Sequence, residues 1–157
     1  MRTLVLGLGN EHAGDDGVGV LAVRPLKGEL AGDADVVESA ASGLALIEVL
    51  AGYDRALIVD SIRTGRAPPG TITELALAEV GTVAAPSLHQ AGIPELAAVA
   101  RRLGLGFPAQ TRVLAVEIAE PPTFGAGLSQ PVAAALAPLR ERVRAQLARW
   151  AATDGPS

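Results

Sequence analysis

Side chains of types that bind metals in proteins lie at the ends of three successive segments of this chain. Asp16 comes after the apolar run at residues 3–8, Asp60 closes the run ALIVD, and His89 stands at the start of a segment with helical apolar spacing. Two carboxylates with one imidazole suit a divalent ion such as Ni²⁺ or Zn²⁺ and leave coordination positions open. The residue types therefore favour a metal-dependent site formed by Asp16, Asp60 and His89.

Each of these side chains also has a structural role open to it. Asp16 or its neighbour Asp15 can cap the helix that follows, because a carboxylate at a helix N-terminus accepts hydrogen bonds from backbone N–H groups. Asp60 can form a turn before Ser61, and a single histidine such as His89 is more often structural than chemical. The spacing of these residues permits a shared site without requiring one.

The glycine-rich run around the first acids has some features of a dinucleotide-binding loop. It reads GLGNEHAGDDGVG from residue 7 and follows an apolar, β-prone segment. The GxGxxG fingerprint fails because His12 stands where the third glycine belongs. Asp15 and Asp16 would also repel a pyrophosphate at the helix N-terminus. The run therefore indicates metal ligands or helix-capping groups, with His12 on the surface.

Apolar periodicity predicts the strands and helices that would position these residues. Strands are expected at residues 3–8, 33–38, 55–60, 70–75 (a candidate edge strand) and 112–118. Helical spacing runs from residue 17 through 26, strained by Pro25, and over 43–51, 89–103 and 129–150.

This alternation predicts a single domain over residues 1–157, with a disordered tail after 152. Its fold class is α/β: three α/β/α layers around a mostly parallel, roughly five-stranded twisted sheet. In such sheets the carboxyl ends of parallel strands share one edge, where ligands collect. Asp16, Asp60 and His89 can therefore converge at that edge.

The composition narrows the classes of function. The chain has 157 residues, of which 49% are apolar and 19% charged, which suits one well-buried domain. It has no cysteine, which excludes disulfides, thiolate metal sites and a cysteine nucleophile. No stretch is long enough to span a bilayer. We expect no membrane association and a cytoplasmic protein that is a monomer or weak oligomer.

The charge balance argues against nucleic-acid partners. The net charge is −4, the pI is about 5.1 and aromatic residues make up only 3%, so neither a basic face nor stacking platforms are evident. Four arginines gather in the last predicted helix, at Arg140, Arg142, Arg144 and Arg149. Because Glu141 interrupts them at helical spacing, we interpret them as a solvated helix face.

The order of these motifs resembles the hydrogenase maturation endopeptidases, which trim the C-terminal extension from the large subunit of nickel–iron hydrogenases. The chain opens with LVLGLGN and an acidic pair in GDDGVGV, and continues with LIVDSIRTG, SLHQ and RVLAVEI. It closes with FGAGLS before the final helix, so the likeness runs from Leu4 to about Leu139. The resemblance implies a peptide-bond hydrolase whose partner is the large-subunit precursor.

The metal-contacting residues of that family fall on the three positions already singled out. The resemblance implies that Asp16, Asp60 and His89 contact Ni²⁺ already installed in the precursor, so that the substrate carries the metal. Many members have Glu where this chain has Asp16. Where members commonly show DGGTxG, a segment linked to substrate choice, this chain reads ESAASG from residue 38. On this resemblance, Glu38 and Gly43 are the expected substrate-recognition residues.

Two mechanisms stay open for the predicted catalytic residues Asp16, Asp60 and His89. The ion can polarise the scissile carbonyl and lower the pKa of a water, or nickel can serve only for recognition while Asp16 or Asp60 acts as general base. Rival functions are a non-catalytic nickel-binding accessory protein, a nucleotide-binding module and a peptidyl-tRNA-hydrolase-like esterase. Members of that last class share the opening GLGN but continue with Pro-Gly, where this chain reads Glu11-His12.

Overall fold

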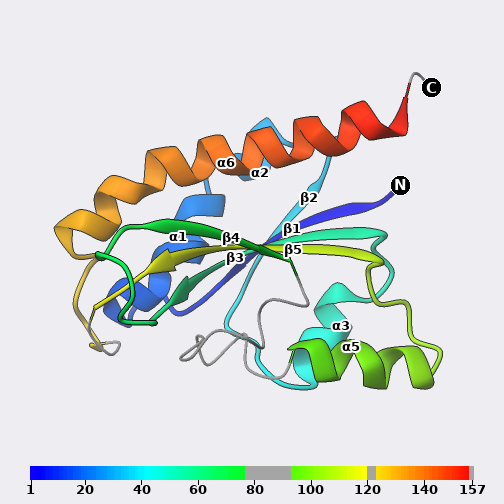
Figure 1. Ribbon diagram of the computed structural model, residues 1–157, viewed down its shortest axis with the longest axis horizontal. Coiled ribbons are helices and arrows are strands. Elements are labelled where there is room, and N and C mark those ends of the chain that lie inside the picture. The colour runs from blue at the N-terminus through cyan, green and yellow to red at the C-terminus, as the bar shows by residue number, and fades with distance from the viewer. Residues whose placement is uncertain (77–92, 120–122, 156–157) are drawn as a thin grey trace.

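The computed structural model describes residues 1–76, 93–119 and 123–155. Within them, five strands form one sheet in the order β2-β1-β3-β5-β4 (Figure 1). Neighbouring strands run parallel except β4, which pairs antiparallel with β5 at one edge. The strands are β1 (Thr3–Leu8), β2 (Asp35–Ser39), β3 (Arg55–Ile62), β4 (Ile72–Ala76) and β5 (Gln110–Glu117). The predicted mostly parallel, five-stranded sheet is therefore confirmed, including its edge strand near residues 70–75.

Strand β3 forms the centre of the sheet and is buried along its whole length. The continuous apolar run ALIV lets both faces of the strand pack against helices, as is usual in parallel sheets. The strand does not stop at Asp60, where the sequence predicted its end. It continues to Ile62 because Ser61 and Ile62 are buried and pair with the end of β5.

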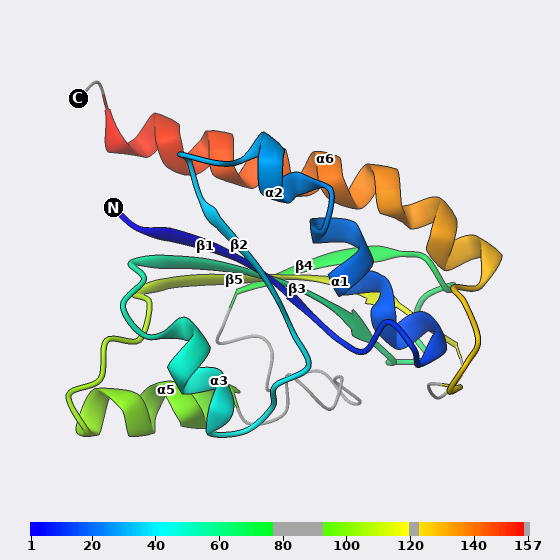
Figure 2. The same ribbon diagram turned by 180° about the vertical axis from the view of Figure 1, so that it is seen from behind.

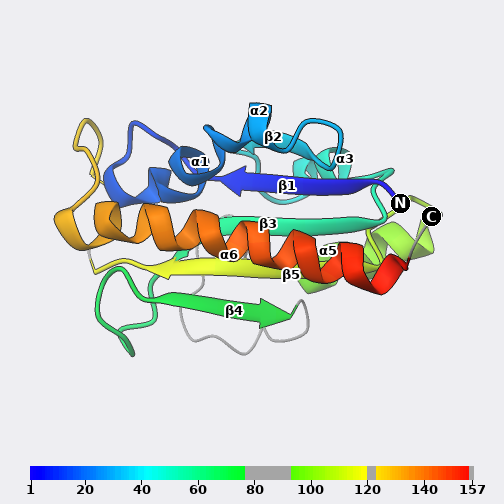
Figure 3. The same ribbon diagram turned by 90° about the horizontal axis from the view of Figure 1, so that it is seen from above.

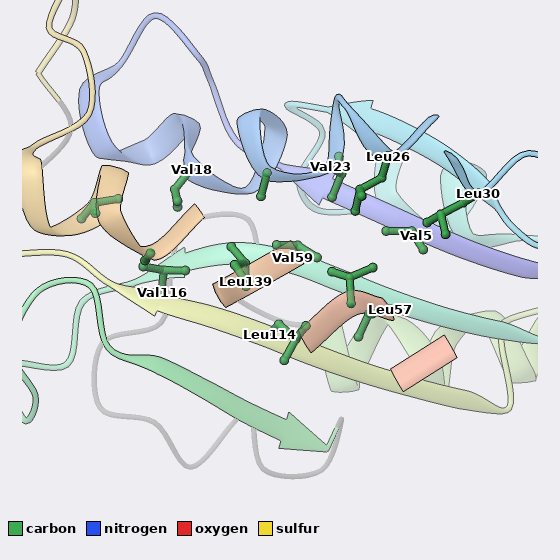
Figure 4. Close-up of a cluster of buried hydrophobic side chains, with 14 of the residues drawn as sticks. Val5, Val18, Val23, Leu26, Leu30, Leu57, Val59, Leu114, Val116 and Leu139 are labelled. Atoms are coloured by element: carbon green, nitrogen blue, oxygen red, sulfur yellow. The ribbon is translucent and has the colours of Figure 1, made fainter. Parts of the chain in front are cut away.

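Helices cover both faces of the sheet, which confirms the three-layer α/β/α architecture (Figures 1 and 2). Helices α1 (Val18–Val23), α2 (Leu26–Glu29) and α6 (Gln130–Asp154) lie on one face, and α3 (Ala45–Leu50) and α5 (Ile93–Arg102) lie on the other. Aliphatic side chains fill the layer between the sheet and α6, including Val5, Leu57, Val59, Leu114 and Leu139 (Figure 4). A second cluster, with Leu46 and Leu50 of α3, packs against the opposite face.

The helical segment expected from residue 17 through 26 is divided in the structure. A short 3₁₀ turn, η1 (Gly14–Gly17), leads into α1, and α2 begins only after Pro25. Proline has no N–H to donate and its ring crowds the preceding turn, so the helix ends before it. The strain predicted at Pro25 is thus relieved by a break between α1 and α2.

Helix α6 differs from the prediction in two respects. It continues to Asp154, beyond the expected end at about residue 150. Its arginines are a solvated face only in part, because three of them also bind other elements. Arg140 donates hydrogen bonds to the carbonyls of Leu21 and Ala22, while Arg144 pairs with Glu29 and Arg149 with Glu74. The last carbonyls of α1 lack partners within their own helix, which is why a guanidinium binds there.

No helix in the described part of the chain is long and apolar enough to cross a membrane.

Candidate functional site

The loops that follow β1, β3 and β5 lie at the same end of the sheet (Figure 3). η1 comes out of the first of these loops and contacts β3 directly. This is the carboxyl edge of the parallel strands, where the sequence predicted a site. Both chain termini lie at the other end of the molecule.

Close glycine contacts press α1 onto this edge. A Cβ added at Gly19 would lie 2.2 Å from the carbonyl oxygen of Val59 and 2.6 Å from that of Leu8. Only a residue without a side chain permits this approach of helix to strands. Since Val59 directly precedes Asp60, the contact holds the turn that carries Asp16 against the end of β3.

Asp16 is buried within η1, and its carboxylate is part of the closed loop after β1. Its Oδ2 accepts a hydrogen bond from the Asn10 backbone N–H at 2.8 Å. The loop is tight because Gly9 has φ +142°, and a Cβ there would lie 2.0 Å from the Asp16 carbonyl oxygen. Asp16 is therefore held in place by backbone contacts at the carboxyl edge.

The prediction that Asp15 or Asp16 caps the first helix is wrong. Neither η1 nor α1 has a side-chain cap, because Ala13 and Gly17 occupy the two cap positions and both acids lie inside η1. Asp15 instead accepts hydrogen bonds from the N–H and hydroxyl of Ser129, at 2.7 and 2.8 Å. It thereby fastens the start of α6 to the loop after β1.

Asp60 is fully buried, with none of its surface exposed. It lies inside β3, opposite Ala115 of β5, and does not form a turn. Its Oδ1 accepts a hydrogen bond from the Ser61 backbone N–H at 2.7 Å. Burying a carboxylate is costly unless hydrogen bonds or a positive charge compensate it. A carboxylate at this position is consistent with a site for a positively charged group.

His89, the third predicted residue, falls in the segment 77–92, outside the described residues. Among the residues that the structure describes, no three His, Cys, Asp or Glu side chains are grouped so that they could hold a metal. The structure thus places Asp16 and Asp60 at one edge, and the predicted triad stays a prediction.

Glu38, a predicted substrate-recognition residue, belongs to a network of ion pairs at the end of β2. Its carboxylate contacts Arg24 at 2.7 Å and Lys27 at 2.5 Å, and Arg24 also binds Glu11 at 2.8 Å. The hydrogen bonds from Arg24 and Lys27 lower the pKa of Glu38 below its ordinary value. The other predicted recognition residue, Gly43, is exposed with φ +58° and open space around it.

Sequence reasoning missed a third buried acid at this edge, Glu117, which ends β5. Its carboxylate accepts hydrogen bonds from the Thr64 N–H (2.8 Å), the Thr64 hydroxyl (2.6 Å) and the Gly65 N–H (3.3 Å). The signal for it was present in RVLAVE, an apolar strand that ends in an acid, as ALIVD does.

An exposed pair of aromatic rings, His12 and Phe124, lies in the loops that follow β1 and β5. The rings of His12 and Phe124 are tilted, with centroids 6.5 Å apart, and Phe124 is 80% exposed. Two backbone hydrogen bonds join their loops, from Gly125 N–H to the His12 carbonyl (2.6 Å) and from Gly14 N–H to the Ala126 carbonyl (3.1 Å). His12 is on the surface, as predicted.

Comparisons with known proteins agree on one family. The family model described as hydrogenase maturation protease matches residues 20–146. The hydrogenase 2 maturation protease of Escherichia coli is 31% identical over 153 residues, covering 94% of this chain and 91% of that protein. The hydrogenase expression/formation protein HupD of Thiocapsa roseopersicina is 29% identical over 152 residues, which are 94% of this chain and 68% of HupD.

Solved structures of the same family share the fold. The hydrogenase maturating endopeptidase HybD of Escherichia coli superposes with a TM-score of 0.81 at 31% identity, covering 95% of this chain and 93% of that one. The [NiFe] hydrogenase maturation protease HybD of Thermococcus kodakarensis gives 0.72 at 26% identity, covering 94% and 99%.

Proposed function

Since the chain belongs to the hydrogenase maturation protease family, a family of peptide-bond hydrolases, we propose that it removes the C-terminal extension from the nickel-loaded large-subunit precursor of a nickel–iron hydrogenase. The observation that carries this proposal is the pair of buried carboxylates, Asp16 and Asp60, on adjoining elements at the carboxyl edge of the sheet. We assign the chain to the cytoplasm, where it acts as a monomer or weak oligomer.

The role proposed for Asp16, Asp60 and His89 is to contact the nickel that the precursor carries. Buried carboxylates favour a nearby cation, because it compensates the loss of hydration of their charges. In this proposal the metal belongs to the substrate, so the enzyme tests that nickel is in place before it cuts. Hydrolysis then uses either polarisation of the scissile carbonyl by the ion or a carboxylate of the site as general base.

The segment from Glu38 to Gly43 is proposed to contribute to substrate choice. It continues from the end of β2, which pairs with β1 at the same edge of the sheet. Because Glu38 already binds Arg24 and Lys27, it acts here by fixing the surface that this network presents.

The test uses the full chain with nickel-loaded and nickel-free large-subunit precursor, and mass spectrometry to follow loss of the C-terminal peptide. Cleavage is expected only with the loaded precursor. Asp16→Asn and Asp60→Asn are expected to slow it by roughly 100-fold or more. Asp33→Asn makes the same chemical change at an exposed position and is expected to leave the rate unchanged.

The outcomes separate the alternatives. If wild-type protein binds nickel-loaded precursor but releases no peptide from any such precursor, the proposal fails and the accessory-protein alternative holds. If a triple variant, Asp16→Ala, Asp60→Ala and His89→Ala, cleaves at the wild-type rate, the site assignment is wrong. Membership of a peptide-bond hydrolase family does not favour the peptidyl-tRNA-hydrolase-like esterase.

A further inference from the structure

We propose that the loop at residues 63–66, called here the arginine loop, binds side-chain carboxylates of an acidic segment of the precursor, and that Glu117 is the positioning residue that holds this loop. The inference rests on the proposed function and adds a recognition surface to it. The arginine loop leaves β3 only three positions after Asp60, at the carboxyl edge of the sheet (Figure 3). A precursor whose cleaved segment binds at this edge would therefore contact the arginine loop.

Glu117 fixes the backbone of the arginine loop from inside the protein. The residue is buried, and its carboxylate binds the loop through three hydrogen bonds, two from Thr64 and one from Gly65. Within the loop, the Arg66 N–H donates to the Thr64 hydroxyl at 3.0 Å. Within the described ranges, the carboxylate of Glu117 binds the arginine loop alone, through two N–H groups and a hydroxyl, so we infer that it fixes this loop.

The chain beyond the arginine loop is fixed as well. The Gly70 N–H donates to the Glu117 carbonyl at 2.8 Å. A Cβ added at Gly70 would lie 2.5 Å from the carbonyl oxygen of Pro131, so this turn is pressed against the start of α6. A loop held at both ends loses little freedom on binding, and this preorganisation increases affinity.

The two arginines of the loop differ from most others in the protein. Arg63 and Arg66 are exposed, and neither has a carboxylate partner among the described residues. Six other arginines pair with carboxylates within the protein: Arg2, Arg24, Arg55, Arg112, Arg144 and Arg149. Exposed arginines without a carboxylate partner among the described residues also occur on α5 and α6, so what distinguishes Arg63 and Arg66 is their place on a fixed loop at the carboxyl edge. A guanidinium presents a planar fork that matches a carboxylate. Two such groups on a fixed loop beside the candidate site therefore fit an acidic peptide.

The charges do not fit a nucleic acid as the occupant. The chain has a net charge of −4, and a protein that follows a phosphate backbone needs a longer basic surface. The described residues of the arginine loop include no aromatic side chain for base stacking.

The first experiment compares charge reversals in cleavage of the nickel-loaded precursor. We expect the double variant Arg63→Glu, Arg66→Glu to raise KM by about tenfold or more while kcat stays within about twofold, because rim charges act mainly on association. The salt dependence of kcat/KM should also weaken in this variant. The matched control is Arg101→Glu, Arg102→Glu, an equal change of charge at the exposed end of α5, for which we expect wild-type kinetics.

The second experiment tests Glu117 while both arginines remain. In Glu117→Gln an amide NH₂ replaces one of the two acceptor oxygens, and the oxygen that remains is uncharged, so it accepts more weakly from the loop N–H groups than the carboxylate does. We expect KM to rise in the same direction as in the arginine variant but by less, with little change in kcat. Combined with Arg63→Glu and Arg66→Glu, the substitution should add nothing more to KM, because the loop then has no arginines to position. Thr64→Val removes the two hydrogen bonds of the hydroxyl, to Glu117 and from the Arg66 N–H, but keeps the bonds from the loop N–H groups to Glu117, so it supplies a second variant with a rise in KM.

Three results would overturn the inference. If wild-type protein cleaves the precursor and the arginine variant has an unchanged KM, the inference fails while the proposed function stands. If Glu117→Gln lowers kcat and its effect adds fully to that of the arginine variant, Glu117 has a general structural role. If the wild-type protein cleaves no loaded precursor, the proposed function fails and takes this inference with it.

Discussion

At the scale of single residues, the carboxylate of Glu38 connects charge, stability and the proposed recognition segment. Its side chain is only 19% exposed and contacts two cations, Arg24 and Lys27. Their hydrogen bonds lower its pKa from the ordinary value of 4.5. A group whose pKa is lower in the folded than in the unfolded state stabilises the fold above its unfolded pKa and loses this effect as the pH falls through its folded pKa.

We therefore expect Glu38→Gln to destabilise the protein by roughly 0.5–1 kcal/mol near neutral pH. The difference from wild type should stay constant from about pH 8 to 5 and shrink as the pH falls from 4.5 through the lowered pKa of folded Glu38, because the protonated side chain is neutral like Gln. Urea unfolding followed by circular dichroism at several pH values measures this. Glu48→Gln, on an exposed carboxylate of α3, is the control and should show no such trend. A difference that is independent of pH would contradict the expectation.

The residues of the site were predictable to different degrees. Asp16 and Asp60 could be found because each follows an apolar run, and in a parallel sheet that position lies at the carboxyl edge. The partner of Asp15 could not be found, because Ser129 is 114 residues away and only the folded chain brings them together. Glu117 carried the same signal as Asp60, but its function of fixing residues 64 and 65 depends on the course of a loop that periodicity does not describe.

At the scale of elements, the contact of α1 with β1 and β3 decides where the turn carrying Asp16 lies. The contact depends on Gly19, because the helix backbone there approaches the carbonyl oxygens of two strands. Those oxygens belong to the sheet backbone and cannot move aside as a flexible side chain could. A methyl group at this point must therefore push helix and sheet apart.

We expect Gly19→Ala to destabilise the protein by about 2–3 kcal/mol or more, although alanine is the better helix former. Gly28→Ala is the matched control: Gly28 lies in α2 with nothing within 4 Å of an added Cβ, so alanine there should be neutral or stabilising by up to about 1 kcal/mol. Thermal and urea unfolding of both variants measure the difference. Equal stability of the two variants would mean that α1 can withdraw from the sheet without cost.

The elements themselves followed from the sequence more fully than their ends and contacts did. The apolar run of β1 predicted its bounds, because strand periodicity and flanking glycines agree. The end of β3 was missed, because Ser61 is polar although it is buried in the sheet. The contacts of the α6 arginines were missed because helical spacing shows which residues share a face, and not which carbonyls or carboxylates lie opposite them. Arg140 binds α1 across 118 and 119 residues of sequence.

At the scale of the whole molecule, the sheet has different functions at its two ends. The candidate site lies at the carboxyl end, while the amino end of β3 binds the C-terminal helix. Arg55 is 3% exposed, and its guanidinium pairs with Asp154 at the end of α6 and lies 5.6 Å from the centre of the Trp150 ring. Its Nε has no hydrogen-bond partner in the described part of the chain. The pair with Asp154 is thus the main compensation for a buried charge.

Removing this compensation should lower stability without changing the chemistry. We expect Asp154→Asn to lower Tm by about 5 °C or more, because it leaves the buried Arg55 charge without an opposite charge. We expect kcat and KM for the nickel-loaded precursor to stay at wild-type values well below Tm. Arg55 and Asp60 are five positions apart on β3, which separates this ion pair from the candidate site by about 16 Å.

Asp33→Asn is the control for this prediction, since it makes the same change at an exposed carboxylate near the same end of the molecule. Differential scanning calorimetry and cleavage assays on the two variants separate the effects. An unchanged Tm in Asp154→Asn would show that the ion pair contributes nothing to stability. Water would then stabilise the charge of Arg55 to the same degree as the Asp154 carboxylate does. Reduced kcat at a temperature where the variant is fully folded would show instead that β3 transmits a change from its amino end to Asp60. We expect the ion pair at the amino end of β3 to affect stability alone, because β3 is buried and hydrogen-bonded on both sides between Arg55 and Asp60.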